Sequence, residues 1–235
     1  TRPLPFCDTI GIAETGSGKT LAYLIPMLSR ILSLPKLTDF NRHNGPYGLI
    51  LVPTRELAQQ IESELNKMLK FLPDYKVLSL VGGKLIERDI IELQRSAVHI
   101  VIATPGRLID CLENRYIALK HLGFLVLDES DKLIEMNFID QVEKITEYIT
   151  SPERQNMMFT ATMNNDVERL SKKYVDRANC GTVSIGNINT SSKEMVMNER
   201  ITQKFEILPI NYKTPGYEEK KFRKLERILN DEFYK

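Results

Sequence analysis

The sequence predicts an α/β fold, in which a mainly parallel central sheet is flanked by helices on both faces. Apolar runs of strand length alternate with segments of helical periodicity over most of the 235 residues. The runs are continuously apolar rather than alternating, which is typical of parallel strands covered on both faces. A glycine-rich loop that ends in Lys19-Thr20 lies directly between the first apolar run and the first helical segment. This strand–loop–helix order is typical of α/β domains that bind phosphate groups.

The expected strands and helices follow one another in regular alternation. The apolar runs lie at residues 9–12, 48–52, 77–81, 98–102, 124–127 and 156–159. The helical segments begin with 21–25 and continue with 56–71, 87–94, 139–148 and 167–174. Ligands of such sheets bind at the carboxyl ends of the strands. Because the chemically distinctive segments of this chain all follow strands, we expect them at one edge of the sheet.

The glycine-rich loop has the composition of a phosphate-binding P-loop. It consists of Ala13, Glu14, Thr15, Gly16, Ser17, Gly18, Lys19 and Thr20. Backbone N–H groups of the loop and of the helix that follows direct partial positive charge at phosphates, and Lys19 adds a full charge. The Thr20 hydroxyl can reach a metal, and glycine at 16 and 18 lets the backbone wrap without a Cβ in the way. The general pattern begins with Gly where this chain has Ala13, but a simple Gly/Ser turn does not explain the Gly-Lys-Thr ending.

Two further polar segments directly follow strands. The first consists of Asp128, Glu129, Ser130 and Asp131. A carboxylate there can hold Mg²⁺ against the β- and γ-phosphates, while its neighbour orients or deprotonates water. Alone, an acidic tetrapeptide is usually the first turn of a helix; its pairing with the P-loop favours the functional interpretation. The second segment is Thr160-Ala161-Thr162, whose hydroxyls either connect the acidic turn to another element or cap a helix.

Five motifs in this order resemble those of the DEAD-box RNA helicases. They are residues 13–20, Pro53-Thr54-Arg55-Glu56-Leu57-Ala58, Thr104-Pro105-Gly106-Arg107, 128–131 and 160–162. The resemblance extends from the first residues to about Ile185, and the text around the motifs, such as 45–47 and 112–116, is most similar to the spliceosomal member. Ser130 stands where the family usually has Ala, and Thr160 stands where it has Ser. Both replacements keep the size or the hydroxyl, so we expect function to survive.

The resemblance implies an ATP-dependent RNA helicase that uses ATP and Mg²⁺ and separates short duplexes. Lys19 and Glu129 would be catalytic, residues 13–20 would bind the nucleotide, and Thr20 and Asp128 would hold the metal. The implied RNA contacts are Pro53, Thr54, Arg55, Gly82, Gly83, Thr104, Pro105, Gly106 and Arg107. Asp131 with Thr160, Ala161 and Thr162 would couple hydrolysis to domain movement. The RNA contacts would be to the backbone, with weak sequence preference, because phosphate and sugar contacts carry little sequence information.

The resemblance also implies a domain organisation. Residues 1–186 are expected to form the N-terminal RecA-like domain, without the upstream element that reads adenine. Residues 187–199, rich in Asn, Ser and Thr, are expected to form a linker. Residues 200–235 then read as the start of the C-terminal RecA-like domain, with a strand at 200–207 and an amphipathic helix at 217–229. Because arginines of that second domain complete the ATP site in the family, we expect this chain alone to bind nucleotide weakly and to be nearly inactive.

Composition limits how this chain could bind nucleic acid or metals and whether it could cross a membrane. The formal net charge is +1, so nucleic-acid binding depends on a few placed groups rather than on a global positive field. The cysteines and histidines have no metal-ligand spacing; they are Cys7, Cys111, Cys180, His43, His99 and His121. No apolar run approaches a membrane span. We expect an intracellular and, from the resemblance, nuclear protein with spliceosomal protein partners.

Two alternatives remain open at the level of sequence. A non-catalytic RNA-binding or scaffolding module could keep a P-loop for stability, although a decayed site would be expected to have lost one of Lys19, Thr20, Asp128 and Glu129. A DNA-directed P-loop motor is a weaker alternative, disfavoured by the motif text. Substitution of Lys19 or Glu129 distinguishes the catalytic interpretation from the scaffolding one.

Overall fold

The structure is a computed structural model, and it describes residues 7–38, 40–83, 85–151, 154–176, 178, 180–185 and 216–233. The chain divides into two units, residues 1–192 and residues 193–235. The expected linker at 187–199 and the expected strand at 200–207 lie outside the described residues. In the described part of the chain, no helix is both long enough and apolar enough to span a bilayer.

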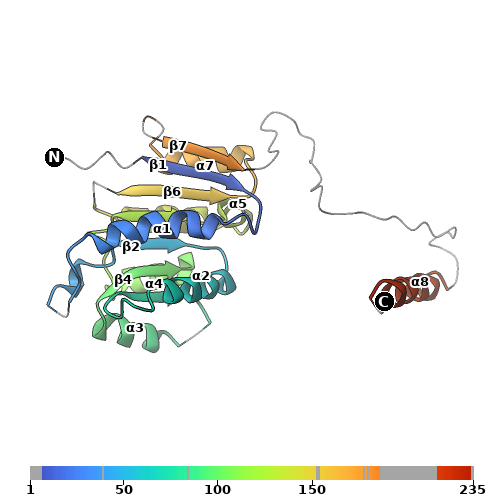
Figure 1. Cartoon of the computed structure of the whole chain (residues 1–235), viewed down its shortest axis with the longest axis horizontal. Coiled ribbons are helices and arrows are strands. Elements are labelled where there is room, and N and C mark those ends of the chain that lie inside the picture. Colours follow the sequence, from blue (N-terminus) through green and yellow to red (C-terminus); the bar gives the residue numbers. More distant parts are fainter. Residues whose placement is uncertain are drawn as a thin grey trace. The chain divides into compact units, whose positions relative to one another are not determined.

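The first unit is built on a seven-stranded sheet with the order β3-β4-β2-β5-β6-β1-β7. Its strands are β1 (Asp8–Ala13), β2 (Gly48–Leu51), β3 (Lys76–Leu80), β4 (Val98–Ala103), β5 (Phe124–Leu127), β6 (Gln155–Thr160) and β7 (Cys180–Ile185). All six pairs of neighbouring strands in this sheet are parallel, and the strand arrows of Figure 1 run in one direction. The predicted parallel α/β sheet is therefore confirmed.

The predicted strands are all present, and β7 is an additional one. It pairs only with β1 at the edge of the sheet, and its side chains are largely exposed: Val183 is 54% and Ile185 is 55% accessible. A strand without a buried face has no apolar run to identify it. For this reason the sequence pattern missed β7.

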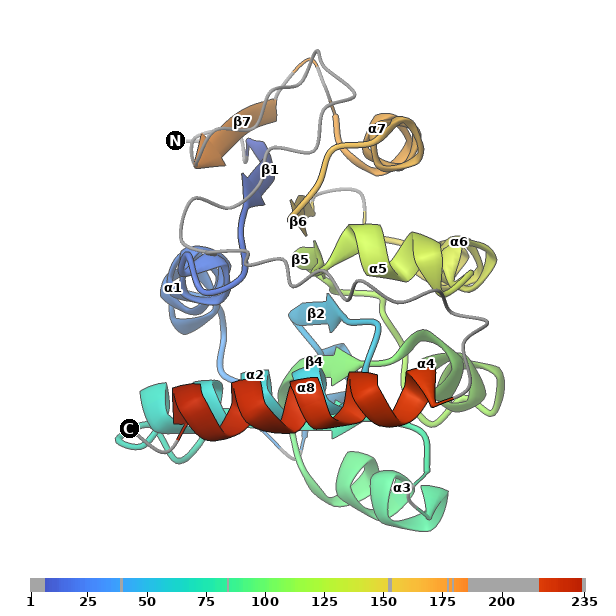
Figure 2. The same ribbon diagram turned by 90° about the vertical axis from the view of Figure 1, so that its right-hand side faces the viewer.

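Helices connect the strands and cover both faces of the sheet. In the first unit they are α1 (Lys19–Leu32), the short 3₁₀ helix η1 (Arg42–Asn44), α2 (Arg55–Met68), α3 (Ile86–Arg95), α4 (Pro105–Glu113), α5 (Ser130–Glu135), α6 (Ile139–Glu147) and α7 (Asn165–Tyr174). Figure 2 looks along the strands and shows α1 on one side of the sheet and α5, α6 and α7 on the other. The helix predicted at 56–71 ends at Met68, and Phe71 beyond it is 85% exposed.

Two apolar clusters fill the space between the sheet and the helices. One contains Leu49 and Leu51 of β2 with α4 to α7, and the other contains Ile50 of β2 with α1 and α2. Successive side chains of a strand point to opposite faces, so one continuously apolar run contributes to both clusters. This is the physical reason for the uninterrupted apolar runs in the sequence.

The second unit is described only from Gly216 to Phe233, where α8 (Tyr217–Phe233) forms. The helix predicted at 217–229 is therefore confirmed and runs one turn longer. Its apolar stripe is accessible, with Phe222 66%, Leu225 51% and Leu229 44% exposed.

Candidate functional site

The sequence motifs lie at the carboxyl ends of the parallel strands, where the strand order divides them into two groups. Segments that follow β3, β4 and β2 are neighbours in the strand order, and so are segments that follow β5, β6 and β1. The first group holds the expected RNA contacts; the second holds the P-loop, the acidic turn and the threonine segment. Backbone hydrogen bonds continue beyond the strand ends and hold the first residue after each strand beside the end of its neighbour. They join Thr104 N to Leu80 O at 3.1 Å, Val52 N to Ala103 O at 3.0 Å and Asp128 N to Leu51 O at 3.0 Å.

The P-loop follows β1 and opens α1, as the sequence predicts. Gly16 has φ 82° and Gly18 has φ 93°, so both occupy the left-handed region that favours glycine. No atom lies within 4 Å of a Cβ built on either residue. The backbone angles themselves thus favour glycine at both positions. The Lys19 ammonium group donates to the Ala13 carbonyl across the loop.

The acidic turn follows β5 and opens α5. Asp128 is 3% exposed, and its Oδ1 accepts from the Glu129 N–H at 2.9 Å. Glu129 has φ 48° and ψ 51°, a left-handed conformation that costs a non-glycine residue about 1–3 kcal/mol. This conformation turns the chain sharply from the strand into the helix. The Glu129 carboxylate accepts from Lys132 Nζ at 2.9 Å, and its side chain is 19% exposed.

Tyr23 of α1 joins the P-loop helix to the acidic turn. Its side chain is fully buried, and its hydroxyl donates to Asp128 Oδ2 at 2.8 Å. The Thr20 side chain, one turn earlier on α1, acts to lower the pKa of Tyr23. Tyr23 carries no functional signal in the sequence, because an aromatic residue at helical spacing is typical of a core position. Thr20 and Tyr23 are three residues apart on one helix, a spacing that places them on the same face.

The threonine segment is connected to the acidic turn through Asp131. Asp131 Oδ2 accepts from the Ala161 N–H at 3.2 Å, the Thr162 N–H at 3.1 Å and the Thr162 hydroxyl at 3.2 Å. The Thr160 hydroxyl donates to the Thr162 carbonyl at 2.8 Å. Of the two sequence interpretations, connection to another element is the one that the geometry matches. No helix begins at this segment, since α7 starts at Asn165 with Asn164 as its cap.

The electrostatics of the acidic turn are those of a buried carboxylate. Burial raises the pKa of Asp128 above its ordinary value, while hydrogen bonds from Tyr23 and from the Glu129 N–H, and the charge of Lys19, oppose the rise. Burial also raises the pKa of Tyr23 far above its ordinary value, with the Asp128 charge adding to the effect. Tyr23 therefore remains a donor to Asp128 throughout the physiological pH range.

The donor set of Thr20 and Asp128 fits Mg²⁺. Mg²⁺ is usually held by one or two carboxylates together with substrate phosphates and water, rather than by a cage of protein ligands. Among the described residues no cluster of three or more His, Cys, Asp or Glu side chains is placed to bind a metal. Asp128 and Thr20, both next to Tyr23, would supply one carboxylate and one hydroxyl to Mg²⁺. Phosphate oxygens of the nucleotide and water would supply the remaining metal ligands.

Arg55 and the paired glycines lie together in the other group. Thr54 caps α2, since its side-chain oxygen accepts from the Leu57 N–H at 3.3 Å. Arg55 is exposed, and its Nη1 donates to the Gly82 carbonyl at 3.2 Å. A Cβ on Gly83, which has φ 81°, would collide with the same Arg55 nitrogen. Gly83 thus makes room for the Arg55 guanidinium, which stays at the surface where a phosphate can reach it.

Arg107 has a different environment from Arg55. Thr104 precedes α4, and its side chain makes no capping hydrogen bond, while Pro105 and Gly106 form the first turn. Arg107 Nη1 pairs with Asp89 Oδ2 of α3 at 2.6 Å, and the two side chains are 8% and 7% exposed. Arg107 is therefore engaged in a buried ion pair that joins α3 to α4.

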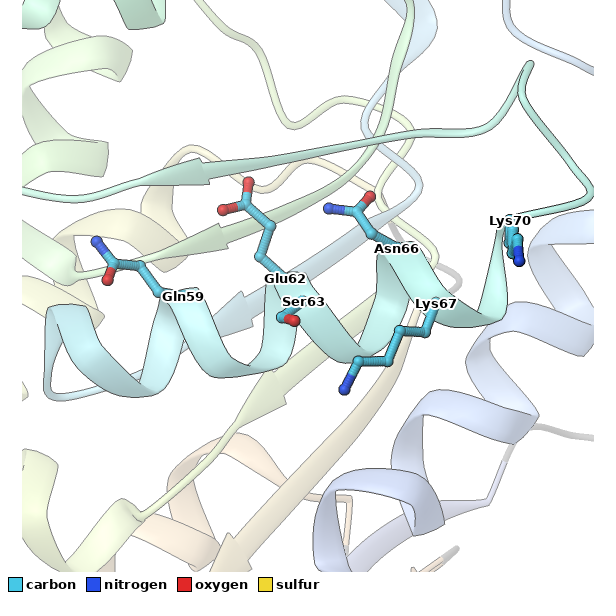
Figure 3. A pocket seen from close by; sticks show the side chains of 6 residues that line it. All are labelled: Gln59, Glu62, Ser63, Asn66, Lys67 and Lys70. Carbon is cyan, nitrogen blue, oxygen red and sulfur yellow. The ribbon is translucent and has the colours of Figure 1, made fainter.

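A polar groove of about 530 Å³ runs along the outer side of α2. It is lined by Gln59, Glu62, Ser63, Asn66, Lys67 and Lys70, and Figure 3 shows Glu62 and Asn66 pointing to one side of the helix and Lys67 to the other. Glu62 accepts from the Ser79 N–H and hydroxyl at 3.0 and 2.8 Å, and Lys67 pairs with Glu64 at 2.7 Å. Five of the lining residues belong to α2 and Lys70 lies just beyond its end, so the groove lacks the convergent groups of the strand-end site.

Comparisons with known proteins agree with this geometry. The family described as DEAD/DEAH box helicase matches residues 4–170. The chain is 41% identical over 240 residues to DEAD-box ATP-dependent RNA helicase 21 of Oryza sativa subsp. japonica, covering 95% of this chain and 30% of that protein. It is 40% identical over 240 residues to the pre-mRNA-splicing ATP-dependent RNA helicase prp28 of Schizosaccharomyces pombe, covering 94% of this chain and 34% of that protein.

A solved structure shares the fold. The crystal structure of the yeast DEAD-box splicing factor Prp28 superposes with a TM-score of 0.74 at 40% identity, covering 79% of this chain and 42% of that one. The chain spans about a third of the length of the curated relatives described above.

Proposed function

The chain belongs to the DEAD/DEAH box helicase family, and from this premise we propose that it is the N-terminal catalytic half of an ATP-dependent RNA helicase. The substrates are ATP with Mg²⁺ and RNA whose short duplexes are separated locally. The observation that carries the proposal is the meeting of the P-loop helix and the acidic turn at the Tyr23 hydroxyl. β1 and β5 are separated only by β6, so their ends lie about 10 Å apart. That span suits a polyphosphate held between them.

Each residue of the proposed nucleotide site has one task. Lys19 leaves the Ala13 carbonyl and stabilises charge on the β- and γ-phosphates, as the loop N–H groups at 13–20 do. Thr20 and Asp128 hold the metal. Mg²⁺, when bound with ATP, neutralises charge on the phosphate oxygens. Glu129 leaves Lys132 and orients the attacking water.

The proposed RNA surface lies at the carboxyl ends of β3, β4 and β2. Pro53, Thr54 and Arg55, Gly82 and Gly83, and Thr104 to Arg107 contribute hydroxyls, N–H groups and a guanidinium to the RNA backbone. Arg55 is the exposed cation of this set, whereas Arg107 supports the surface through its pair with Asp89. Asp131 and residues 160–162 connect this machinery to domain movement, since their hydrogen bonds link the ends of β5 and β6.

The similarity to the splicing helicase prp28 of Schizosaccharomyces pombe and to the crystal structure of yeast Prp28 supports a role in pre-mRNA splicing. Such a role would place the protein in the nucleus with spliceosomal protein partners. We propose residues 1–186 as the first RecA-like domain, 187–199 as the linker and 200–235 as the start of the second. Arginines of a second domain raise turnover by about 10³–10⁵ in related enzymes. The 235-residue chain alone is therefore expected to turn over ATP near background and to bind RNA with Kd of roughly 10⁻⁴–10⁻⁶ M.

Two substitutions in a chain that includes both domains test the proposal. Lys19→Ala should abolish nucleotide binding, because the loop loses its full positive charge. Glu129→Gln should leave binding intact and stop hydrolysis, because the amide cannot take a proton from water. The measurements are the affinity for a fluorescent ADP analogue and RNA-stimulated phosphate release.

Lys67→Ala on the outer side of α2 is the matched control, since it also removes a lysine and should change neither quantity. ATPase activity that survives both Lys19→Ala and Glu129→Gln would place hydrolysis elsewhere. Binding of RNA without any nucleotide binding by the unsubstituted protein would support the scaffolding alternative.

A further inference from the structure

Tyr23 lies between the two side chains proposed to hold the metal. Its hydroxyl donates to Asp128 Oδ2 at 2.8 Å, and Thr20 lies one turn earlier on the same helix. Thr20 belongs to the first turn of α1, whereas Asp128 follows β5, so the two come from segments distant in the sequence. The Tyr23 hydroxyl connects the helix that carries Thr20 to Asp128.

Packing accounts for the ring of Tyr23 but not for its hydroxyl. The ring is fully buried and tilts against Phe159 with centroids 5.1 Å apart, within the apolar cluster that includes Leu24 and Met27. Phenylalanine would fill nearly the same volume. A buried hydroxyl must find a hydrogen-bond partner to offset its desolvation, and here the partner is a carboxylate that itself is 3% exposed.

The hydrogen bonds orient the Asp128 carboxylate. Oδ1 accepts from the Glu129 N–H at 2.9 Å and Oδ2 accepts from Tyr23, so each oxygen is held by one donor. A carboxylate has about four lone-pair positions, and two of them remain for a metal and its water. Groups that hold a metal ligand in this way fix its rotation and commonly change metal affinity by about 10–100-fold when removed.

We propose that Tyr23 is a positioning residue, which holds the Asp128 carboxylate and the Thr20 hydroxyl in register for the magnesium–nucleotide complex. The inference rests on the proposed function, because it presupposes that these two residues take part in metal binding. In this role Tyr23 acts through its two neighbours and is not itself a ligand of the metal. Its contribution is to Mg²⁺-dependent binding and not to the binding of the nucleotide alone.

The test is Tyr23→Phe in the 235-residue chain. The affinity for a fluorescent ADP analogue is measured with Mg²⁺ and again with the metal removed by EDTA. The ratio of the two affinities reports the metal contribution. We expect Tyr23→Phe to reduce this ratio by about tenfold or more while the metal-free affinity stays within about twofold.

Tyr47→Phe is the matched control. The Tyr47 side chain is also largely buried, and its hydroxyl donates to the Pro35 carbonyl at 2.9 Å, at the opposite end of β2. This variant also loses one tyrosine hydrogen bond, so its thermal stability should fall about as much as that of Tyr23→Phe. Its affinity ratio should equal that of the unsubstituted chain, because no metal ligand is touched.

The outcomes separate this inference from the proposed function. An unchanged affinity ratio in Tyr23→Phe, alongside Mg²⁺-dependent binding in the unsubstituted chain, overturns the positioning role and leaves the function standing. An equal loss in Tyr47→Phe also overturns it, since the effect would then follow from stability. Absence of nucleotide binding from the unsubstituted chain overturns the function and this inference together.

Discussion

At the scale of single residues, His99 is a buried imidazole whose charge state depends on the fold. It is 1% exposed, and the Tyr75 ring lies 4.7 Å away between centroids. Backbone N–H groups of Leu37 and Lys76 face its two ring nitrogens at 3.3 Å each. Burial lowers the pKa of His99 below its ordinary value of 6.5, with the Lys36 charge adding to the effect.

The lowered pKa of His99 predicts a loss of stability in mild acid. Below pH 6.5 the unfolded chain takes up a proton that the folded chain binds more weakly. The contribution of His99 is therefore fully present above that pH and decreases as the pH falls towards the folded-state pKa. Thermal unfolding between pH 7.5 and 5.5 should show a falling midpoint.

Substitution isolates this effect from other titrating groups. His99→Gln should lower the midpoint at pH 7.5 but flatten its change down to pH 5.5. His121→Gln, at an exposed histidine, should keep the pH dependence of the unsubstituted chain. An equal pH dependence in His99→Gln would show that other groups cause the loss.

At the scale of elements, the ion pair between Arg107 and Asp89 fixes α4 against α3. Both side chains are less than one-tenth exposed, at 8% and 7%. Breaking a buried ion pair from one side leaves an uncompensated charge and costs about 3–5 kcal/mol. The position of Arg107 in the Thr104–Arg107 motif is thus fixed by Asp89 of α3, a helix outside that motif.

Asp89→Asn should lower the free energy of unfolding by about 3–5 kcal/mol, because the buried Arg107 guanidinium loses the charge of Asp89. Urea denaturation measures the change. Asp110→Asn, at an exposed carboxyl of α4, is the control and should shift the free energy of unfolding by less than about 0.5 kcal/mol. Equal midpoints for Asp89→Asn and Asp110→Asn would contradict the structural role of the pair.

At the scale of the whole molecule, the first unit contains a complete core. Its two apolar clusters and the whole seven-stranded sheet consist of residues up to Ile185. Of the second unit, the structure describes one helix with an accessible apolar stripe. A single helix cannot bury such a stripe by itself. These features support independent stability for the first unit.

Ending the chain after Ser192 should therefore leave the first unit folded. The thermal midpoint should stay within about 2 °C of that of the 235-residue chain, a change of less than 1 kcal/mol for a domain of this size. Differential scanning fluorimetry gives the midpoint, and near-ultraviolet circular dichroism reports the packing of the aromatic side chains. A fall of many degrees would show that residues 193–235 belong to the same cooperative unit.

The sequence by itself determined most of the strands and helices and the motifs that follow the strands, but not α4 and α5, which lie outside the expected helical segments. Continuous apolar runs and helical periodicity are local properties, so they predicted six of the strands and the parallel α/β fold. The spacing of glycines, Lys19 and Thr20 predicted the P-loop in the same way. The edge strand β7 escaped prediction because exposed side chains leave no apolar pattern.

The tertiary structure decided which of these segments became neighbours. The strand order separated the proposed RNA contacts from the nucleotide site, and it brought Tyr23 to Asp128 across 105 residues of sequence. It also paired Arg107 with Asp89 and left Arg55 at the surface. No local pattern encodes such contacts, because they depend on how the helices pack onto the sheet once the whole chain has folded.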